Sequence, residues 1–491
     1  MLTGLAAAVV LIALGFGLNA NKNRLDGGRA EAVALCEEGT EDLNAFRLRD
    51  AVAKLGQCLD LDPTLAEASI SRTAAYMRLG ETDNLAMELA RADSLTGNIV
   101  EDQRRMIAQL RLSGFGKSKF HDQRDSILTR LDQEIPDNIF VLVAKASDAR
   151  MKGDMAAEER GWKKILEVDP NYATAYNMLG YMELGRGNYD QAIDYMKKYA
   201  FISPGLANPH DSLGEVYFVL GRYEEAERSF IESVRIQPDF YHSLINLGRT
   251  YLARGQLEEG LEILEAVRSQ TVGSEIEKRV DNQIVRTYLA AGLDDELARV
   301  ATAYIGKYPD DMMSAFYRGV RLAELGRIDE GRAVMDSTMA HSRKEPWYDE
   351  YDEARRKIEA GAYQFEAVVS DVVGDHAAAA ENWSKAIELF GPKVPFHEQW
   401  YARYRLARAL HAEGRSQDAL AEITPILRIN PRIINLLVLK VECHLALQQG
   451  VMARATLENL DKALYWADKD FPARTKAAEL ALKVAALVSS R

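Results

Sequence analysis

The sequence predicts an all-α protein in which helical hairpins stack into a solenoid. Proline recurs every 34 residues, at Pro136, Pro170, Pro204 and Pro238. Glycine, alanine and bulky apolar residues recur in phase between these prolines. Within each arm, apolar residues follow the i, i+3, i+4 and i+7 spacing of an amphipathic helix. A single hairpin cannot bury its own apolar face, so neighbouring hairpins are expected to stack on one another.

Each recurring residue type has a physical role in such a hairpin. One glycine, inside the first helix, lets the two helices approach closely, and a second glycine ends that helix with a positive φ. Alanine begins the buried stripe of the second helix, and proline ends that helix because it cannot donate the next hydrogen bond. These structural positions are Gly180, Gly214 and Gly248 for the close approach, Gly153, Gly187 and Gly221 for the turn, Ala192 and Ala226 for the stripe, and Pro170, Pro204 and Pro238 for the stop.

The clearest unit is residues 207–238, ANPHDSLGEVYFVLGRYEEAERSFIESVRIQP. A 34-residue helix–turn–helix with this pattern resembles the tetratricopeptide repeat. The resemblance implies a right-handed superhelix of about twelve hairpins, which covers nearly all of the chain after its first segment. It also implies that the first helix of each hairpin lines the concave side. The residues that carry the resemblance are Leu213, Gly214, Tyr217, Gly221, Tyr223, Ala226, Phe230 and Pro238.

The repeat phase divides the chain into segments of different regularity. Residues 1–24 are expected to form an N-terminal membrane anchor or signal segment, and residues 25–136 divergent hairpins. Residues 137–340 form the well-matched array. The phase is lost over 341–359, which we expect to be an irregular break or one extra helix. It returns in 360–491, where we expect C-terminal hairpins and a cap helix.

Residues 2–18 are apolar and uncharged, and Lys22 and Arg24 follow them. This length just reaches the roughly 17–20 residues of a transmembrane helix, so we expect an uncleaved single-pass anchor in a bacterial cell membrane. A cleaved signal peptide is the alternative, although no basic residue precedes the apolar run. The basic residues after the run favour a cytoplasmic array. A single N-terminal apolar segment followed by one large soluble array often exports that array. We therefore expect the array on the extracytoplasmic side, and the cytoplasmic side remains the alternative.

The three cysteines are Cys36, Cys58 and Cys443, and none of them belongs to a CxxC motif. The sequence therefore supports neither a zinc site nor a redox site. Cys36 and Cys58 fall on the two helices of the first predicted hairpin and could form a disulfide in an oxidising compartment. The alternative is that Cys58 fills a position where the hairpin requires a small residue.

The concave side implied by the resemblance offers candidate residues for holding a partner. Its mixture of aromatic and acidic groups with few basic groups suits a peptide or a partner helix. The plainer interpretation is that most of these side chains are solvated or paired locally. Some family members clamp a peptide carboxylate with lysine, arginine and asparagine, but the lysines are missing here and we predict no such clamp. The candidates are Asn177, Tyr181, Asp211, Glu215, Phe218, His242, Ile245 and Arg249, followed by Phe316, Tyr404, Arg408 and His411.

The motifs that would indicate catalysis are incomplete. Residues 114–118 end like a P-loop, but Arg111 stands where the first glycine belongs. His397 and Glu398 lack the second histidine of an HExxH zinc motif. We therefore predict no catalytic residue, no cofactor, no metal and no small-molecule substrate. The formal net charge of −13 argues against nucleic acid as a partner.

These features together predict a membrane-tethered scaffold or adaptor that binds other proteins or peptides. The alternative is a permanent structural subunit of a larger bacterial membrane complex. A minor alternative is an enzyme whose site lies in an irregular segment, 99–136 or 341–359.

Overall fold

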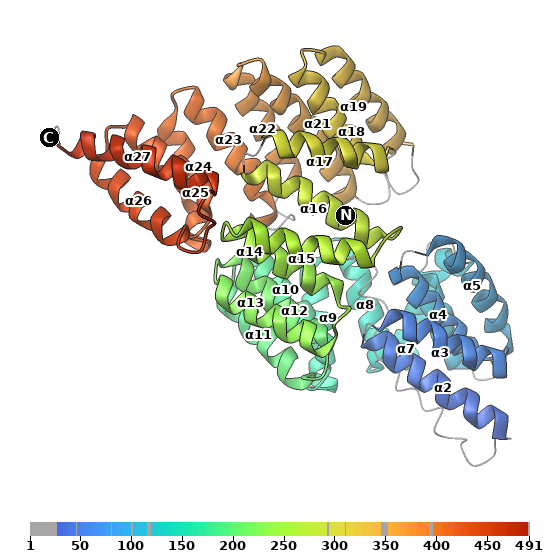
Figure 1. Ribbon diagram of the computed structural model, residues 1–491. Helices are drawn as coiled ribbons and strands as arrows, with labels where there is room; N and C mark the ends of the chain where they lie inside the picture. Colours follow the sequence, from blue (N-terminus) through green and yellow to red (C-terminus); the bar gives the residue numbers. More distant parts are fainter. Residues whose placement is uncertain are drawn as a thin grey trace. The chain divides into compact units, whose positions relative to one another are not determined.

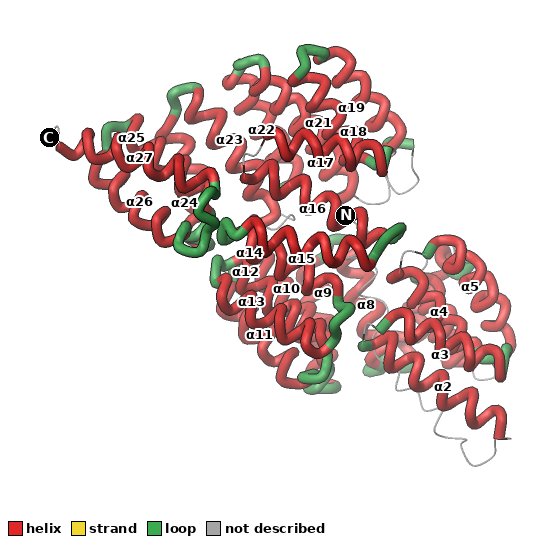
Figure 2. The backbone as a smooth tube through the Cα atoms, in the orientation of Figure 1, coloured by secondary structure: helices red, strands yellow, loops and turns green. Residues whose placement is uncertain are grey.

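The computed structural model describes residues 27–45, 47–79, 81–99, 102–114, 119–291, 294–309, 311–344, 352–391 and 396–489. Within these ranges the chain forms 25 α-helices, three short 3-10 helices and no strand (Figure 2). The expected all-α array of helical hairpins is thus confirmed. The apolar segment 2–18 and the P-loop-like residues 115–118 lie outside the described residues. Among the helices inside them, none combines the length and the apolar character needed to cross a bilayer.

The helices divide into two compact units. Unit 1 comprises the described residues up to 182 together with 195–208, and unit 2 comprises 183–194 and the described residues from 209 onward. Three helices, α10 (Ala173–Arg186), α11 (Tyr189–Ile202) and α12 (Ala207–Val219), therefore have residues in both units. The boundary falls inside 137–340, the segment with the most regular repeat phase.

Unit 1 begins with helices that pair in sequence order, each with its neighbour along the chain (Figure 1). They are α2 (Gly27–Asn44), α3 (Leu48–Leu61), α4 (Ala66–Leu79), α5 (Thr82–Leu95), η3 (Thr96–Asn98), α6 (Asp102–Ser113), η4 (His121–Gln123), α7 (Arg124–Glu134), α8 (Ile139–Met151) and α9 (Met155–Val168).

Unit 2 continues the same order of paired helices to the C-terminus (Figure 1). They are α12 (Ala207–Val219), α13 (Tyr223–Ile236), α14 (Tyr241–Ala253), α15 (Leu257–Gln270), α16 (Glu275–Ala291), α17 (Asp294–Lys307), α18 (Met312–Glu324), α19 (Ile328–Ser342), α21 (Asp352–Val372), α22 (His376–Phe390), η5 (Phe396–Gln399), α23 (Trp400–Ala412), α24 (Ser416–Ile429), α25 (Ile434–Ala446), α26 (Gly450–Ala463) and α27 (Pro472–Ser489).

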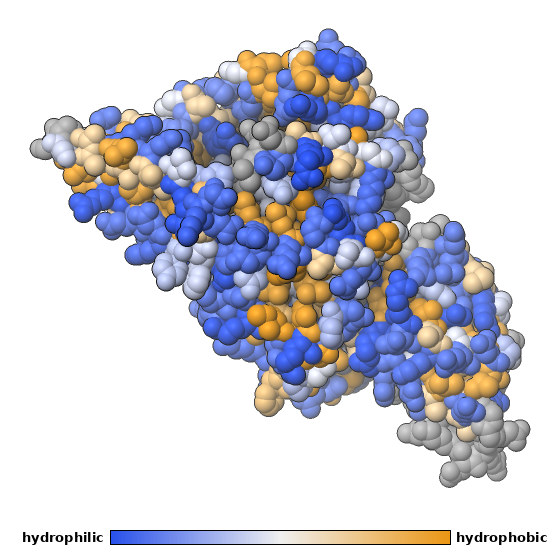
Figure 3. All heavy atoms as spheres, viewed as in Figure 1, coloured by the Kyte–Doolittle hydropathy of each residue, from blue (hydrophilic) through white to orange (hydrophobic). Residues whose placement is uncertain are grey.

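The buried apolar residues form several local clusters along the chain instead of one central core. This distribution is expected for stacked hairpins, because each hairpin buries its apolar face only against its neighbours. Trp162 and Trp383, which occupy the same place in two distant hairpins, are both fully buried. Hydrophilic side chains cover much of the face seen in Figure 3, in keeping with the acidic composition.

The two helices of each regular hairpin meet at the predicted glycine. A Cβ atom added to Gly214 would lie 2.5 Å from Cε1 of Phe230, and one added to Gly180 would lie 2.8 Å from Cε of Met196. At Gly248 the same atom would lie 3.1 Å from the carbonyl oxygen of Gly260. The glycine inside the first helix is therefore the point of closest helix approach, as the repeat phase predicts.

The turns and helix ends also follow the predicted marks. Gly153, Gly187 and Gly221 adopt φ values of 70°, 81° and 70°, where a side chain would be strained. The second helices α9, α11 and α13 each end two residues before Pro170, Pro204 and Pro238. Asp169 and Gln237, which precede two of these prolines, are extended because proline excludes the helical conformation from the residue before it. Ala192 and Ala226 are fully buried.

The expected break at 341–359 contains the end of α19 and the first part of α21. Residues 345–351 between these helices lie outside the described residues. α21 has 21 residues, whereas the regular helices of the array have 13 or 14. The repeat phase therefore resumes through one extended helix.

Cys36 and Cys58 form a disulfide between α2 and α3, with their Cα atoms 5.5 Å apart. Of the two interpretations left open by the sequence, the structure shows the bonded one. Both residues are buried in the apolar cluster of the first hairpin. Cys443 is unpaired and buried, and burial raises the pKa of its thiol to about 12.

We predict that Gly214→Leu destabilises the array by about 3 kcal/mol, because the new side chain would separate α12 from α13 at the ring of Phe230. Chemical unfolding followed by circular dichroism measures the loss. Gly205→Leu is the matched control, because a Cβ atom there would meet nothing within 4 Å. Equal stability of both variants would contradict this packing.

We predict that reduction of the Cys36–Cys58 disulfide, or Cys58→Ser, lowers the stability of the first hairpin by about 3 kcal/mol, since the bond closes a 22-residue separation. Thermal unfolding with and without a reductant measures the loss. Alkylation of the native protein should modify neither cysteine before reduction, and Cys443 only after denaturation. Modification of Cys36 in the untreated native protein would contradict the disulfide.

Candidate partner-binding face

A polar network joins the first helices of two successive hairpins in unit 2. Asp211 on α12 accepts hydrogen bonds from Ser243 Oγ at 2.7 Å and from Asn246 Nδ2 at 3.3 Å, both on α14. The same Asn246 amide donates to Glu215 Oε1 at 3.4 Å. Arg249 then donates to Asn246 Oδ1 at 2.9 Å. Two acidic groups and one basic group from the predicted set are thus brought together through Asn246.

Burial has a clear electrostatic consequence at Asp211, which is 6% exposed. Burial raises the pKa of Asp211 to about 7, and the neighbouring Glu215 carboxylate also acts to raise it. The hydrogen bonds from Ser243 and Asn246 and the charge of Arg249 act in the opposite direction. Asp211 therefore carries only part of a negative charge near neutral pH.

Arg249 lies against the aromatic ring of Phe218, with 5.0 Å between its Cζ atom and the ring centroid. Burial lowers the pKa of Arg249 and the positive charge of Arg286 on α16 lowers it further, whereas the carboxylates of Glu215 and Asp211 act to raise it. Two guanidinium groups from successive first helices therefore lie near each other. Arg249 forms no ion pair with any carboxylate that the structure describes, and the same is true of Arg286.

His242, at the start of α14, contacts Arg279 of α16. Arg279 Nη1 lies 3.2 Å from Nε2 and 3.3 Å from Nδ1 of the imidazole. Burial lowers the pKa of His242 to about 4, and the guanidinium of Arg279 also acts to lower it. Both side chains nevertheless keep contact with solvent. His242 is therefore neutral at pH 7 although its side chain stays exposed to solvent.

The remaining predicted residues separate into two groups. Ile245 is 7% exposed and packs in the apolar cluster of α14, α15 and α16, so its side chain stabilises the core instead of facing a partner. Asn177 and Tyr181 belong to unit 1. Asn177 Oδ1 is buried and has no hydrogen-bond partner among the described residues.

Farther along unit 2, the predicted residues on α18 and α23 have distinct surroundings. Phe316 packs edge-on against Phe365 and is part of a core cluster. Arg408 is exposed and lies over the ring of Tyr404, with 5.9 Å to its centroid. His411 Nδ1 lies 2.9 Å from Ser416 Oγ and 3.6 Å from Cys443 Sγ. Because burial raises the pKa of that thiol, this cysteine–histidine contact holds no reactive thiolate at neutral pH.

Arg279 and Arg286 are absent from the predicted set. They lie seven residues apart on α16, which places them on one face of that helix. This spacing is readable in the sequence. The repeat marks that define the inward face are, however, weak around residues 275–286, because α16 has 17 residues and departs from the regular length. We call the set Asp211, Glu215, Phe218, His242, Asn246, Arg249, Arg279 and Arg286 the first-helix face.

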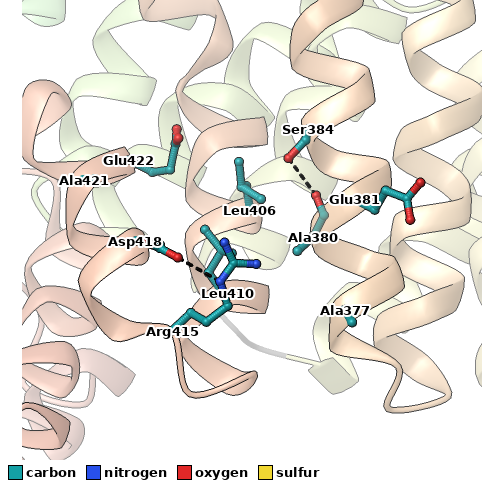
Figure 4. A pocket seen from close by; sticks show the side chains of 10 residues that line it. All are labelled: Ala377, Ala380, Glu381, Ser384, Leu406, Leu410, Arg415, Asp418, Ala421 and Glu422. Carbon is teal, nitrogen blue, oxygen red and sulfur yellow. Dashed lines mark hydrogen bonds and ion pairs between the residues drawn. The ribbon is translucent and has the colours of Figure 1, made fainter.

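A shallow hollow of about 420 Å³ lies elsewhere, among α22, α23 and α24 (Figure 4). Leu406 and Leu410 form its apolar part. The polar groups around it already have partners: Arg415 pairs with Asp418 at 2.8 Å, and Ser384 donates to the carbonyl oxygen of Ala380 at 2.9 Å. No cluster of metal-ligating side chains occurs among the residues that the structure describes. The hollow therefore offers no converging groups for chemistry.

Sequence models of one repeat family match three separate segments of the chain. The matches to the tetratricopeptide repeat cover residues 162–194, 217–277 and 372–431, which include α10, α13 to α15 and α22 to α24. The chain belongs to the tetratricopeptide repeat family. A comparison with curated protein sequences finds no match.

Solved structures resemble this tetratricopeptide repeat chain only at low sequence identity. A tetratricopeptide repeat protein from Parabacteroides merdae is 16% identical and aligns over 57% of this chain and 98% of its own length, with a TM-score of 0.32. MamA is 22% identical over 36% of this chain and 94% of its own length, with a TM-score of 0.29. In the APC/C hetero-tetramer Cut9–Hcn1, the matching chain is 14% identical over 92% of this chain and 86% of its own length, with a TM-score of 0.42. At these values the likeness carries no information about partners.

We predict that Asp211→Asn stabilises this tetratricopeptide repeat array at pH 8 by on the order of 2 kcal/mol and has little effect at pH 4. The pKa of Asp211 is raised in the folded state, so the native protein favours the protonated carboxyl. Its contribution to stability is full below the unfolded pKa and is lost as the pH rises toward 7. Thermal unfolding at both pH values tests this.

The control for that experiment is Asp239→Asn, because Asp239 is exposed and its carboxylate makes no hydrogen bond with the described residues. Its effect should not depend on pH. A destabilised Asp211→Asn variant at pH 8 would show that the carboxylate charge, and not the shape of the side chain, holds α12 to α14.

Proposed function

We propose that the chain is a membrane-tethered scaffold that binds protein partners on the first-helix face of unit 2 and performs no chemistry of its own. The observation that carries this proposal is the presence of three arginines on α14 and α16 that form no ion pair with a described carboxylate. The formal net charge of the whole chain is −13, so acidic groups are abundant elsewhere. A basic face in such a chain is suited to an external acidic group.

The chemistry of the face favours a partner segment that carries carboxylates. Arg249 is already oriented by Phe218 and by Asn246, so its guanidinium needs little further ordering to bind a carboxylate. Arg286 and Arg279 extend the positive charge along α16. Asp211, partly protonated and held by Ser243, offsets less of this charge than a fully ionised carboxylate would. The proposed partner is therefore an acidic peptide segment of another protein.

Membrane attachment, with the array on the extracytoplasmic side, is the second part of the proposal, and each half of it is supported by one observation. Residues 2–18 are apolar and uncharged, which is long enough for a short transmembrane helix. The Cys36–Cys58 disulfide follows close behind this segment, and disulfides persist mainly in oxidising compartments. The apolar segment supports attachment to the membrane, and the disulfide favours an array on its extracytoplasmic side.

The absence of catalysis is proposed from the chemistry of the described residues. The buried thiol of Cys443 stays protonated beside His411, and the hollow among α22, α23 and α24 has its polar groups paired. The polar cluster on α12 and α14 is an internal network whose groups bind each other. A scaffold requires none of these groups to react.

A photocrosslinking amino acid placed at His242 in the full chain should form one or a few discrete protein adducts in native membranes. The same amino acid at Ile231, which is 48% exposed on the second helix α13, is the control and should form few. The charge reversal Arg286→Glu should reduce the His242 adduct about tenfold, since an acidic partner would meet a like charge.

Removal of residues 2–18 should release the chain from the membrane fraction. The shortened chain, mixed with the purified partner, should still form the same photocrosslinked adduct at His242. Equal adducts at His242 and Ile231, or an unaltered adduct with Arg286→Glu, would contradict binding on the first-helix face. A fixed complex that survives detergent extraction and size exclusion would instead favour a permanent subunit.

A further inference from the structure

The hairpins at the two ends of unit 2 touch each other although they lie far apart in the sequence. The corner between α24 and α25 lies against the turn between α12 and α13. The corner between α26 and α27 lies against the turn between α14 and α15. The hydrogen bonds of these contacts join residues 207 to 213 positions apart in the sequence.

The first contact is centred on Asn430, which is 2% exposed. Its Nδ2 donates to the hydroxyl of Tyr223 at 3.2 Å. A Cβ atom added to Gly221 would lie only 2.2 Å from Asn430 Oδ1, so the turn glycine also serves as the docking point. Arg432 completes this corner by donating to Glu224 Oε2 at 2.7 Å and to the carbonyl oxygen of Gly221 at 3.4 Å.

The second contact caps a helix from a distance. Asp468 Oδ2 accepts hydrogen bonds from the backbone N–H groups of Leu257 at 2.7 Å and Glu258 at 3.4 Å, in the first turn of α15. The residue before that helix, Gln256, provides no side-chain cap. Asp468 therefore acts as the missing N-cap, and its own N–H donates to the carbonyl oxygen of Gly255 at 3.0 Å.

The docking residues on both sides are placed by the repeat. Gly221 and Gly255 lie one repeat apart, and with φ values of 70° and 80° they form equivalent turns of successive hairpins. Arg474 fixes the second corner by donating to the carbonyl oxygens of Leu464, Ala467 and Asp468. The two contacts therefore have a defined register. The turns of two consecutive hairpins, α12–α13 and α14–α15, meet two consecutive corners, α24–α25 and α26–α27.

The two contacts join opposite edges of the stack of hairpins. In a stack of hairpins, the turns inside hairpins lie along one edge and the corners between hairpins lie along the other. Here the inside turns after α12 and α14 meet between-hairpin corners after α24 and α26. One edge of the solenoid is thus joined to the opposite edge one superhelical turn later.

The contact is built from groups that can separate. Its ion pair, Arg432–Glu224, is partly exposed at 23% and 41%, and such pairs stabilise weakly. The hydrogen bonds of Asn430 and Asp468 can be replaced by water. Apolar packing supports these groups at both corners, because Tyr223, Ala467 and Phe471 are buried and Arg432 lies 4.9 Å from the centroid of the Tyr223 ring. Opening would expose these side chains to water while the hairpins themselves stay folded, which makes it a local opening below the free energy of global unfolding.

We propose that residues 430–432 and 464–471 form a reversible latch that joins successive superhelical turns of unit 2 and controls side access of a protein partner to the first-helix face. The proposal rests on the proposed function for the identity of the site that it controls. The latch itself consists of contacts within the chain and can be measured without any partner.

The experiment uses hydrogen exchange of the full chain. Arg432→Glu should increase exchange about tenfold at residues 254–258, which contact the other corner, because the two corners open together. Asp468→Ala should in turn increase exchange at residues 218–224. A merely local role of each residue would change exchange only at its own corner. The matched controls are Arg428→Glu and Asp470→Ala, which alter exposed neighbours and should change neither corner.

The double variant Glu224→Arg with Arg432→Glu should restore slow exchange at both corners, which separates loss of the latch from failure to fold. Independent behaviour of the corners, or no increase at either, would overturn the latch. With the photocrosslinker at His242, the open variants should give several-fold more adduct than the controls. An unchanged yield with opened corners would overturn the control of access. No adduct in any variant would instead overturn the proposed function, while exchange still decides the latch.

Discussion

The two helices of each regular hairpin are held together at a point where one of them has no side chain. At Gly214 the ring of Phe230 occupies the space that any Cβ atom would take, and Met196 does the same at Gly180. This close approach sets the distance and the crossing of the helices in every regular hairpin. Since each hairpin buries its apolar face only against its neighbours, the geometry of one contact is copied along the chain. The stacking of the array, the position of its first helices and the placement of its turns all follow from it.

Polar groups between successive first helices add a second layer of constraint in unit 2. Hydrogen bonds of Asp211 with Ser243 and Asn246 join α12 to α14. Asn246 in turn accepts a hydrogen bond from Arg249 and so orients its guanidinium group. Burial makes the charged form of Asp211 costly, so the network is held mainly by hydrogen bonds. The arginines of α14 and α16 form no close ion pair with a described carboxylate, although Asp211 and Glu215 attract Arg249 electrostatically. The same helices that carry the fold thereby present a basic face in an acidic protein.

Part of this face could be predicted from the repeat phase, and part could not. Asp211, Glu215, Phe218, His242 and Arg249 were identified because they stand at inward positions of well-marked hairpins. The same rule also selected Ile245, which is buried in the core, because a helix face has no sharp edge between its core side and its open side. Arg279 and Arg286 were missed because α16 departs from the regular length, so the register of the repeat could not be carried onto it.

The sequence by itself determined the local structure of this protein. The recurrence of glycine, alanine and proline placed the helix contacts, the turns with positive φ and the helix ends, because each of these depends on residues within one repeat. Tertiary structure alone decided whether Cys36 meets Cys58, since a disulfide needs its Cα atoms within a few ångströms. It also decided that Asn430 reaches Tyr223 and that Asp468 caps α15. Such contacts depend on the small rotation between hairpins, which accumulates over a full turn and leaves no periodic mark in the residues that meet.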